Sequence, residues 1–327
     1  MPRVAHRPDA LAWQVFRGSG AVRAGLLTEH QLRSSTWIRL RHDVYADARL
    51  ARDHGLACRA VTLRAPAGTR IAGPSAAYLH GVEHAASFTD DVHVLAPAAT
   101  GLRSQRGLRV HTVQPRPAAG GPPLDPAPRA PGIRLENTLP IPTAGTLVRS
   151  DPATAAWETA VWLEPVRAVG IVDTLLARGL TTRAALAEVA VRTAGRTGGK
   201  RAGWVFGLAD AAAQSPPESH LRVRLVLAGL PRPVAQYPVR LSSGLVLHPD
   251  LAWPDYRVAV EYDGRWHADA DQLHRDRQQL NLLVGTGWLV LHVTSRRMER
   301  DLAAVVREVR AALVSRGWRR RPPGGPR

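Results

Sequence analysis

The last third of the chain alternates helix and strand patterns, and this order constrains the fold more than any other feature of the sequence. Apolar residues recur at helical and strand spacings in the order helix, three strands, helix, strand and helix. We expect helices over 217–228, 270–284 and 298–316, and strands over 234–239, 246–251, 257–262 and 288–293. This order predicts an α/β core in which helices cover a sheet.

Acidic residues follow two of the predicted strands. Asp250 lies at the end of one strand, and Glu261 and Asp263 share one face of the next because strand side chains alternate in direction. If the two strands pair, the three carboxylates converge. Carboxylate oxygens suit Mg²⁺, which activates a bound water and offsets the charge that develops on a scissile phosphate. The spacing therefore predicts a cation site for phosphate chemistry.

Two further side chains lie close to these acids in the sequence. His267 follows Asp263 by four residues, and its imidazole titrates near neutral pH, so it is a candidate to position or deprotonate water. Glu218, in the first turn of the preceding helix, is a candidate outer ligand. A single strand carboxylate is more often a solvated edge residue, and Asp263-Gly264 also suits a turn.

The same residues resemble a nuclease signature. Pro249-Asp250, ten intervening residues and then Glu261-Tyr262-Asp263 are similar to the PD-(D/E)XK pattern, with Asp263 where a lysine usually stands. Residues 213–315 resemble very-short-patch-repair-like (Vsr-like) endonuclease domains more closely. The strings that carry this resemblance are Ser215-Pro216-Pro217-Glu218 before Arg222, Gln236-Tyr237, Asp250-Leu251-Ala252-Trp253-Pro254, Glu261-Tyr262-Asp263-Gly264 followed by His267, Asp276-Arg277, and Gly287-Trp288.

The resemblance implies a restriction-endonuclease-like α/β core over residues 213–316. It makes Asp250 and Glu261 the ligands of Mg²⁺ or Mn²⁺, Glu218 an assisting acid, and His267 a general base or phosphate contact; Asp263 completes the catalytic set. The signature lysine helps to activate water, so its absence leaves two interpretations. The domain is either a histidine-dependent nuclease or a fold that has kept binding and lost cleavage.

The first fifty residues follow the outline of a winged helix, with a helix, a turn, a second helix beginning after Thr28, and a strand. Gly25-Leu26-Leu27-Thr28, His30-Gln31-Leu32-Arg33, Trp37 and Val44-Tyr45-Ala46 resemble the N-terminal domain of AbiEi-type antitoxins, with Asp43 in place of the usual glycine. Four residues are candidate DNA contacts in such a unit: Gln31, Arg33, Arg39 and Arg41. The same side chains also fit ordinary solvated positions.

Composition divides the remainder of the chain. Residues 51–212 form an α/β and then helical middle region, interrupted at 115–132 by seven prolines, a composition typical of a loop or linker. Residues 317–327 are expected to form a disordered basic tail. We therefore expect an α+β or α/β multidomain protein with units at 1–50, 51–212 and 213–316.

Charge and cysteine usage indicate the partner and the compartment. The chain has 44 Lys and Arg against 27 Asp and Glu, a net charge of +17, which favours a polyanionic partner. DNA is the expected partner, and RNA fits as well because neither motif set distinguishes the two sugars; no protein partner is indicated.

No apolar run approaches the ~18 residues that a spanning helix needs, so no membrane association is expected. Cys58 is the single cysteine, which is typical of the cytoplasm.

These observations support three interpretations of function. The first is a metal-dependent DNA endonuclease that hydrolyses phosphodiester bonds and docks through its N-terminal unit. The second is a noncatalytic, antitoxin-like DNA-binding transcriptional regulator that uses a degenerate nuclease fold as a scaffold. The third is an RNA-directed nuclease.

Overall fold

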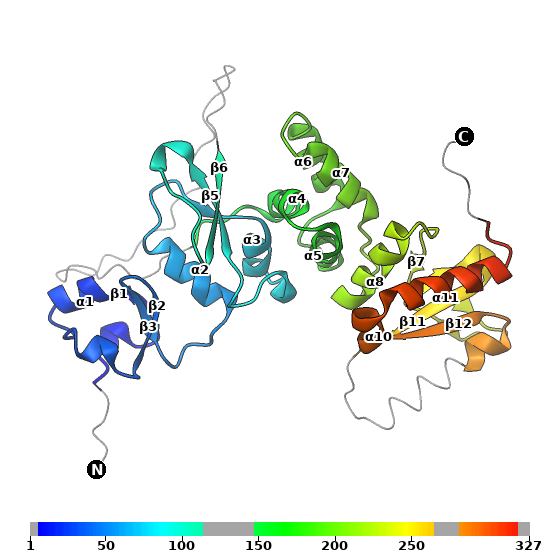
Figure 1. Ribbon diagram of the computed structural model, residues 1–327, viewed down its shortest axis with the longest axis horizontal. Helices are drawn as coiled ribbons and strands as arrows, with labels where there is room; N and C mark the ends of the chain where they lie inside the picture. The colour runs from blue at the N-terminus through cyan, green and yellow to red at the C-terminus, as the bar shows by residue number, and fades with distance from the viewer. Residues whose placement is uncertain (1–5, 114–146, 265–280, 320–327) are drawn as a thin grey trace, which may run out of the picture. The chain divides into compact units, whose positions relative to one another are not determined.

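The computed structural model describes residues 6–113, 147–264 and 281–319, and over these ranges the protein is of the α+β class (Figure 1). The chain forms two compact units, residues 1–151 and 152–327, so the boundary lies inside the segment 51–212. The predicted loop at 115–132 and the last part of the predicted tail lie outside the described residues.

The first unit begins with a small antiparallel sheet of order β1-β3-β2. Its elements are β1 (Val15–Arg17), α1 (Gly18–Arg23), the 3-10 turn η2 (Gln31–Arg33), β2 (Trp37–Arg41) and β3 (Val44–Asp47). Phe16 and Trp37 pack edge to face in its core, with ring centroids 5.1 Å apart. The helix expected after Thr28 is only this 3-10 turn, whose N-cap position is His30, although Thr28 Oγ1 accepts a hydrogen bond from Gln31 N at 3.2 Å.

Asp43 occupies the turn between β2 and β3 in the left-handed backbone region, with φ of +59°. This region favours glycine, but aspartate tolerates it because its short side chain can bond nearby backbone. The Asp43 carboxylate accepts hydrogen bonds from Ser19 N at 2.7 Å and from Arg17 Nε at 3.0 Å. The aspartate thus ties the turn to the junction between β1 and α1.

The rest of the first unit is a second α/β layer. It contains α2 (His54–Thr62), β4 (Arg70–Ile71), α3 (Gly73–Leu79), β5 (Val92–Pro97) and β6 (Leu108–Val113), with short 3-10 turns at Glu83–Ala85 and Ala98–Thr100; the turn Asp9–Leu11 precedes β1. The strands form a sheet of order β4-β5-β6, in which β5 and β6 are parallel. Alternate residues of β5 are buried, because one face of the sheet packs against the helices.

The second unit starts with helices. They are α4 (Pro152–Trp162), α5 (Pro165–Ala177), α6 (Arg183–Arg192), α7 (Gly199–Leu208) and α8 (Pro216–Leu227). Helix α8 packs along α5 through one face and contributes Leu221 and Leu225 to the core beneath the following sheet through another. It therefore joins the helical layer to the sheet.

The sheet of the second unit has the order β12-β11-β10-β7. Its elements and their neighbours are β7 (Val234–Ala235), β8 (Val239–Arg240), β9 (Val246–Leu247), β10 (Leu251–Trp253), the 3-10 turn η5 (Pro254–Tyr256), β11 (Val258–Asp263), β12 (Leu289–Thr294), α10 (Ser295–Arg300) and α11 (Leu302–Ser315). Strand β11 is antiparallel to β10 and parallel to β12. Helices α8 and α11 cover one face, where Val258 and Val260 are buried, and Ala259 faces a second core on the other side.

Three predicted elements of this unit are divided in the structure. The strands expected at 234–239 and 246–251 each become two short segments, separated near Pro238 and Pro249, since proline cannot donate to a ladder. The helix expected at 298–316 is two helices, because Asp301 ends α10 and caps α11 by accepting a hydrogen bond from Ala304 N at 3.0 Å. Most of the helix expected at 270–284 lies outside the described residues.

Among the described residues, no helix combines the length and apolar character needed to cross a membrane.

Candidate functional site

The antiparallel pairing of β10 with β11 brings Asp250 beside Glu261. Leu251 is opposite Val260 in the register, so the residue before β10 lies next to the residue after Val260. Asp250 N is 3.5 Å from Glu261 Oε2, and both side chains are half-buried. The convergence of these two predicted ligands is thus a consequence of strand pairing.

Neutral donors hold the Asp250 carboxylate in place. Tyr262 N donates to Oδ2 at 2.8 Å, and Gln236 Nε2 donates to Oδ1 at 3.0 Å. Gln236 has a φ of +52°, and its own Oε1 accepts a hydrogen bond from Gln214 Nε2 at 3.0 Å. Neither Asp250 nor Glu261 has a cationic side chain within ion-pair distance in the part of the chain that the structure describes.

The electrostatics of the pair follow from burial and like charge. Burial, with Glu218 and Asp263 nearby, raises the pKa of Asp250 to about 6. Burial and then the Asp250 charge raise the pKa of Glu261 to about 8, with smaller contributions from Asp263 and Glu218. The four acids therefore repel one another, and a cation would relieve the repulsion. Perturbed carboxylates of this kind are typical of functional sites.

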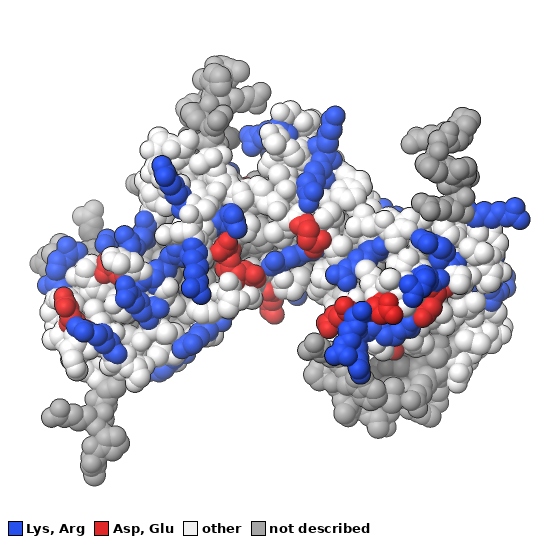
Figure 2. Space-filling view, viewed as in Figure 1, with Lys and Arg blue, Asp and Glu red and all other residues white. Residues whose placement is uncertain are grey.

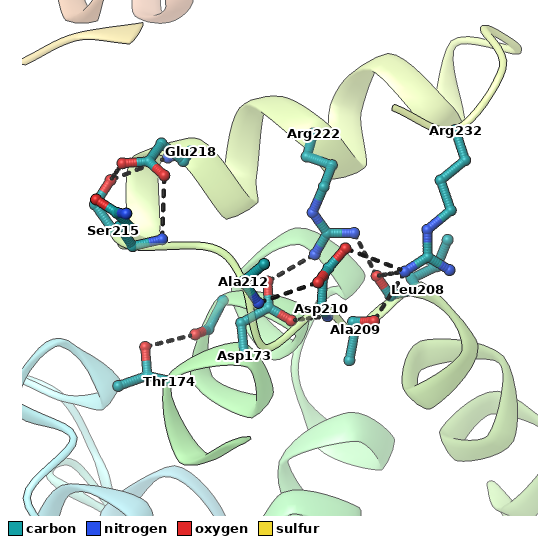
Figure 3. Close-up of polar contacts among 12 residues, drawn as sticks. Asp173, Thr174, Leu208, Ala209, Asp210, Ala212, Ser215, Glu218, Arg222 and Arg232 are labelled. Carbon is teal, nitrogen blue, oxygen red and sulfur yellow. Dashed lines mark hydrogen bonds and ion pairs between the residues drawn. The ribbon is translucent and has the colours of Figure 1, made fainter. Parts of the chain in front are cut away.

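Glu218 is nearly buried in the first turn of α8, where it closes a reciprocal cap (Figure 3). Its Oε1 accepts a hydrogen bond from Ser215 Oγ at 2.7 Å and its Oε2 accepts one from Gln214 N at 3.1 Å, while Glu218 N donates to Ser215 Oγ at 3.4 Å. The predicted outer ligand is thus turned toward the start of its own helix, and its charge reaches Asp250 and Glu261 only through space.

Asp263 pairs with a histidine that the sequence did not single out as a site residue. His292 Nδ1 lies 3.1 Å from Asp263 Oδ2, and both side chains are exposed. Parallel pairing of β11 with β12 places His292 opposite Glu261. No local pattern identifies His292, because its position depends on the pairing of strands far apart in sequence. His267, the predicted base, lies outside the described residues, as does Asp276.

The donor chemistry of the site fits Mg²⁺ or Mn²⁺. No three His, Cys, Asp or Glu side chains form a ready cluster for a metal ion within residues 6–113, 147–264 and 281–319. Asp250 and Glu261 offer the adjacent carboxylate oxygens, and Mg²⁺ commonly takes one or two carboxylates and completes its shell with waters and a phosphate. The pair is therefore suited to an ion that is shared with substrate.

A buried ion pair anchors α8, the helix that carries Glu218. Arg222 Nη2 donates to Asp173 Oδ2 on α5 at 2.6 Å, and each side chain is 1% exposed. Arg222 Nη1 donates to the Leu208 carbonyl at the end of α7. Arg183 and Arg232 donate to the Ala209 carbonyl at 2.6 Å and 2.9 Å, so three arginines gather at the C-terminal end of α7, where the last carbonyls lack intrahelical donors. Figure 3 shows Arg222 and Arg232 at this end.

The four candidate DNA contacts differ in exposure and in the hydrogen bonds that their side chains make within the chain. Gln31 Oε1 accepts a hydrogen bond from Thr28 N at 2.7 Å, and Arg41 Nη1 donates to the Gly107 carbonyl at 3.1 Å. Arg33 Nε donates to the Glu29 carbonyl at 3.3 Å, with its side chain exposed. Arg39 is exposed on β2.

Comparison with known proteins finds relatives of unassigned activity. Uncharacterised proteins from two strains of Mycobacterium tuberculosis are each 29% identical to this chain over 228 residues, which covers 69% of this chain and 74% of each relative. No protein-family model matches the sequence. No solved structure matches it either.

Proposed function

We propose that the protein is a metal-dependent DNA endonuclease that hydrolyses phosphodiester bonds. In this proposal residues 213–316 form a Vsr-like domain of the PD-(D/E)XK superfamily, and residues 1–50 form an AbiEi-like winged-helix unit. The observation that carries it is the adjacency of Asp250 and Glu261 on paired strands, with raised pKa values and no cationic partner within ion-pair distance among the described residues. Such a pair favours a divalent ion.

The residues of the chain have separate parts in this proposal. Asp250 and Glu261 would hold Mg²⁺ or Mn²⁺, which supplies Lewis-acid stabilisation of a scissile phosphate and an activated water when bound. Tyr262 N and Gln236 orient the Asp250 carboxylate, so that its oxygens keep a fixed direction. Glu218 adds negative potential that favours the cation.

The base in this proposal cannot be lysine. Lys200 is the only lysine of the chain and belongs to α7, outside the acidic site. His292 is the described imidazole beside the acids, and in the tautomer in which Nδ1 donates to Asp263, Nε2 is free to accept a proton from water. His267 remains the second candidate.

The basic charge of the chain supports a nucleic-acid substrate. On the face shown in Figure 2, Lys and Arg side chains are spread over both units instead of forming one patch. A spread of this kind supplies sequence-independent attraction to phosphates, which weakens as salt is raised. It supports binding along a duplex and selects no particular sequence.

A plasmid-nicking assay tests the proposal. We expect the wild-type protein to nick supercoiled DNA with Mg²⁺ or Mn²⁺, and Asp250→Ala and Glu261→Gln to nick no faster than a protein-free sample, because each removes a ligand. Asp255→Asn is the matched control, since Asp255 is exposed in η5, outside the acidic pair. Equal rates for all four proteins, or no nicking by the wild type, would reject the proposal.

The second candidate function is an antitoxin-like regulator that binds DNA without cutting it. The absence of the signature lysine favours it, together with the exposed Arg33 and Arg39 in the N-terminal unit. It predicts that Arg33→Ala and Arg39→Ala weaken a DNA gel shift while Glu261→Ala leaves the shift unchanged. Metal-dependent nicking that Glu261→Ala abolishes excludes this candidate. Matched DNA and RNA hairpins in both assays identify the preferred nucleic acid.

A further inference from the structure

The first unit contains a cavity, whereas the acidic pair belongs to the second unit. Its volume is about 620 Å³, within the range of small-molecule sites. The end of β2, helix α2, and the loops that precede β5 and β6 line it. The lining combines cations and an aromatic ring, among them Arg41, His42, Arg64, Phe88 and Arg106.

Backbone carbonyls hold two of these arginines in position without neutralising them. Arg41 donates to the Gly107 carbonyl at 3.1 Å and to the Arg106 carbonyl at 3.4 Å. Arg64 Nη1 donates to the His42 carbonyl at 3.0 Å and lies 3.1 Å from His42 Nδ1. Burial and the nearby Arg64 charge lower the pKa of Arg41, with Asp91 acting in the opposite direction. The guanidinium groups thus repel each other across the cavity.

The two acids of the lining make hydrogen bonds of their own. Asp90 Oδ2 accepts hydrogen bonds from Ser87 N at 2.7 Å and from Ser87 Oγ at 3.0 Å. Asp91 accepts one from Gly107 N at 2.9 Å and pairs with Arg109 at 3.3 Å, and its charge partly offsets that of Arg41. Three arginines, Arg41, Arg64 and Arg106, line the cavity against these two acids. The lining therefore carries an excess of positive charge, which suits an anion.

The remaining walls suit a flat organic group. Phe88 is half-buried and packs against the core formed by β1, β3 and α2, so its ring has little freedom. Gln105 and Thr89 add polar groups to the lining. Bases stack on fixed aromatic rings in a way that tolerates any base, and guanidinium groups match phosphate oxygens. An inorganic phosphate alone would fill only a small part of the volume.

We propose that this cavity binds a nucleoside phosphate, with Arg41 and Arg64 holding the phosphate and Phe88 contacting the base. The ligand is either a free nucleotide or the 5′-phosphorylated end of a strand, which share this chemistry. The proposal also gives Arg41 a role inside the first unit, distinct from the exposed Arg33 and Arg39. It does not depend on nuclease activity in the second unit.

Isothermal titration of the full-length protein tests the proposal with AMP, GMP, CMP, UMP and inorganic phosphate. We expect saturable binding of nucleoside monophosphates, at least about tenfold weaker binding by Arg64→Ala, because charged hydrogen bonds are lost, and weaker binding by Phe88→Leu. Arg103→Ala is the matched control, exposed in the same loop as Gln105 but outside the lining. Circular dichroism confirms that each variant is folded.

Each outcome decides the proposal or the source of the ligand. If a 5′-phosphorylated tetranucleotide binds as well as AMP and its 5′-hydroxyl form does not bind, the ligand is the phosphorylated end of a strand. If AMP binds and neither tetranucleotide does, the ligand is a free nucleotide. Absence of saturable binding, equal affinity of Arg64→Ala and Arg103→Ala, or phosphate binding as tight as AMP overturns the proposal. Glu261→Gln is expected to bind AMP normally, so failure of this site is distinguishable from failure of the nuclease proposal.

Discussion

Two charged sites lie near helix α8 in the second unit, one buried and one half-buried, and their charges are balanced differently. Arg222 pairs with Asp173 at 2.6 Å, so that site is neutralised by the chain. Burial raises the pKa of Asp173 as well as those of Asp250 and Glu261, but Asp173 has Arg222 as its partner. Among the described residues, Asp250 and Glu261 have no cation within ion-pair distance, and other acids raise their pKa values further. The proposed function accounts for this difference, because a bound cation would balance the charge of the unmatched pair.

Helix α8 carries one residue related to each site. Glu218 and Arg222 are four residues apart, a spacing at which acidic and basic side chains commonly pair on a helix surface. Here Glu218 turns toward Ser215 and Gln214, and Arg222 turns toward Asp173 (Figure 3). The separation keeps the arginine from neutralising the acidic site.

The largest expected effect comes from breaking the matched site. Arg222→Met leaves Asp173 buried without its cation, so the free energy of unfolding should fall by about 3–5 kcal/mol. Urea denaturation followed by circular dichroism measures the change. Arg224→Ala, on the same helix and without an ion pair among the described residues, should change stability by less than about 0.5 kcal/mol.

A second variant separates the cost of an unpaired charge from the value of the pair. Arg222→Met combined with Asp173→Leu removes both charges, so most of the lost stability should return. If the double variant is as unstable as the single one, the stability that Arg222 gives to the helical layer comes from its hydrogen bond to the Leu208 carbonyl of α7 and not from the ion pair.

The unmatched site should make the free energy of unfolding depend on pH. The pKa of Glu261 rises from an ordinary 4.5 to about 8 on folding, so folding takes up a proton between these values. The stabilising contribution is therefore complete below about pH 4.5 and is lost as pH rises through 8. Without metal, Glu261→Gln should raise stability at pH 9 by about 1–3 kcal/mol and change it little at pH 4.

Glu188→Gln is the control for this measurement, because Glu188 is exposed on α6. The difference in stability between each variant and the wild type is followed by urea denaturation from pH 4 to 9. A Glu261→Gln difference that does not vary with pH, like that expected for Glu188→Gln, contradicts a raised carboxyl pKa.

Mg²⁺ should reverse the pH effect if the site binds it. Ligand at 100 times its dissociation constant stabilises the folded state by about 2.7 kcal/mol, so the Tm of the wild type should rise by several degrees at pH 8. Asp250→Asn and Glu261→Gln should show no rise, whereas Glu188→Gln should respond fully. Differential scanning fluorimetry makes the measurement, and an equal rise in all four proteins would assign the effect to other sites.

The smallest expected effect concerns the cap between the two sites. Ser215→Ala removes the hydroxyl that accepts from Glu218 N and donates to Glu218 Oε1, which should cost about 1 kcal/mol of stability. Thr182→Ala removes the comparable cap of α6 and should cost about as much. If the cap also holds Glu218 away from the acidic pair, Ser215→Ala alone should change the Tm rise caused by Mg²⁺.

Strand alternation was the part of the site that sequence could predict. The expected alternation along β11 is observed, since Val258 and Val260 belong to one core and Ala259 to the core on the other face. The positions at which the strands are interrupted were missed, although Pro238 and Pro249 are visible in the sequence. The short η2 turn was also missed, because a helix pattern of five residues does not distinguish an α-helix from a 3-10 turn.

Contacts between distant segments were beyond prediction. The pairing of Arg222 with Asp173 spans 49 residues and that of His292 with Asp263 spans 29. The helical layer packs on α8, and for this reason the second compact unit begins at Pro152. The roles of metal ligand, base and DNA contact stay predictions for the assays above.

The sequence by itself determined the alternation of elements, the face on which Glu261 and Asp263 lie, and the excess of basic charge, because each depends on residue type and local spacing. Only the tertiary structure decided that Asp250 meets Glu261 with no cationic partner among the described residues, that Glu218 turns back into a cap, and that Arg222 pairs with Asp173. The physical reason is that burial and charge partners, which set a carboxyl pKa, arise from strand pairing and helix packing across long separations.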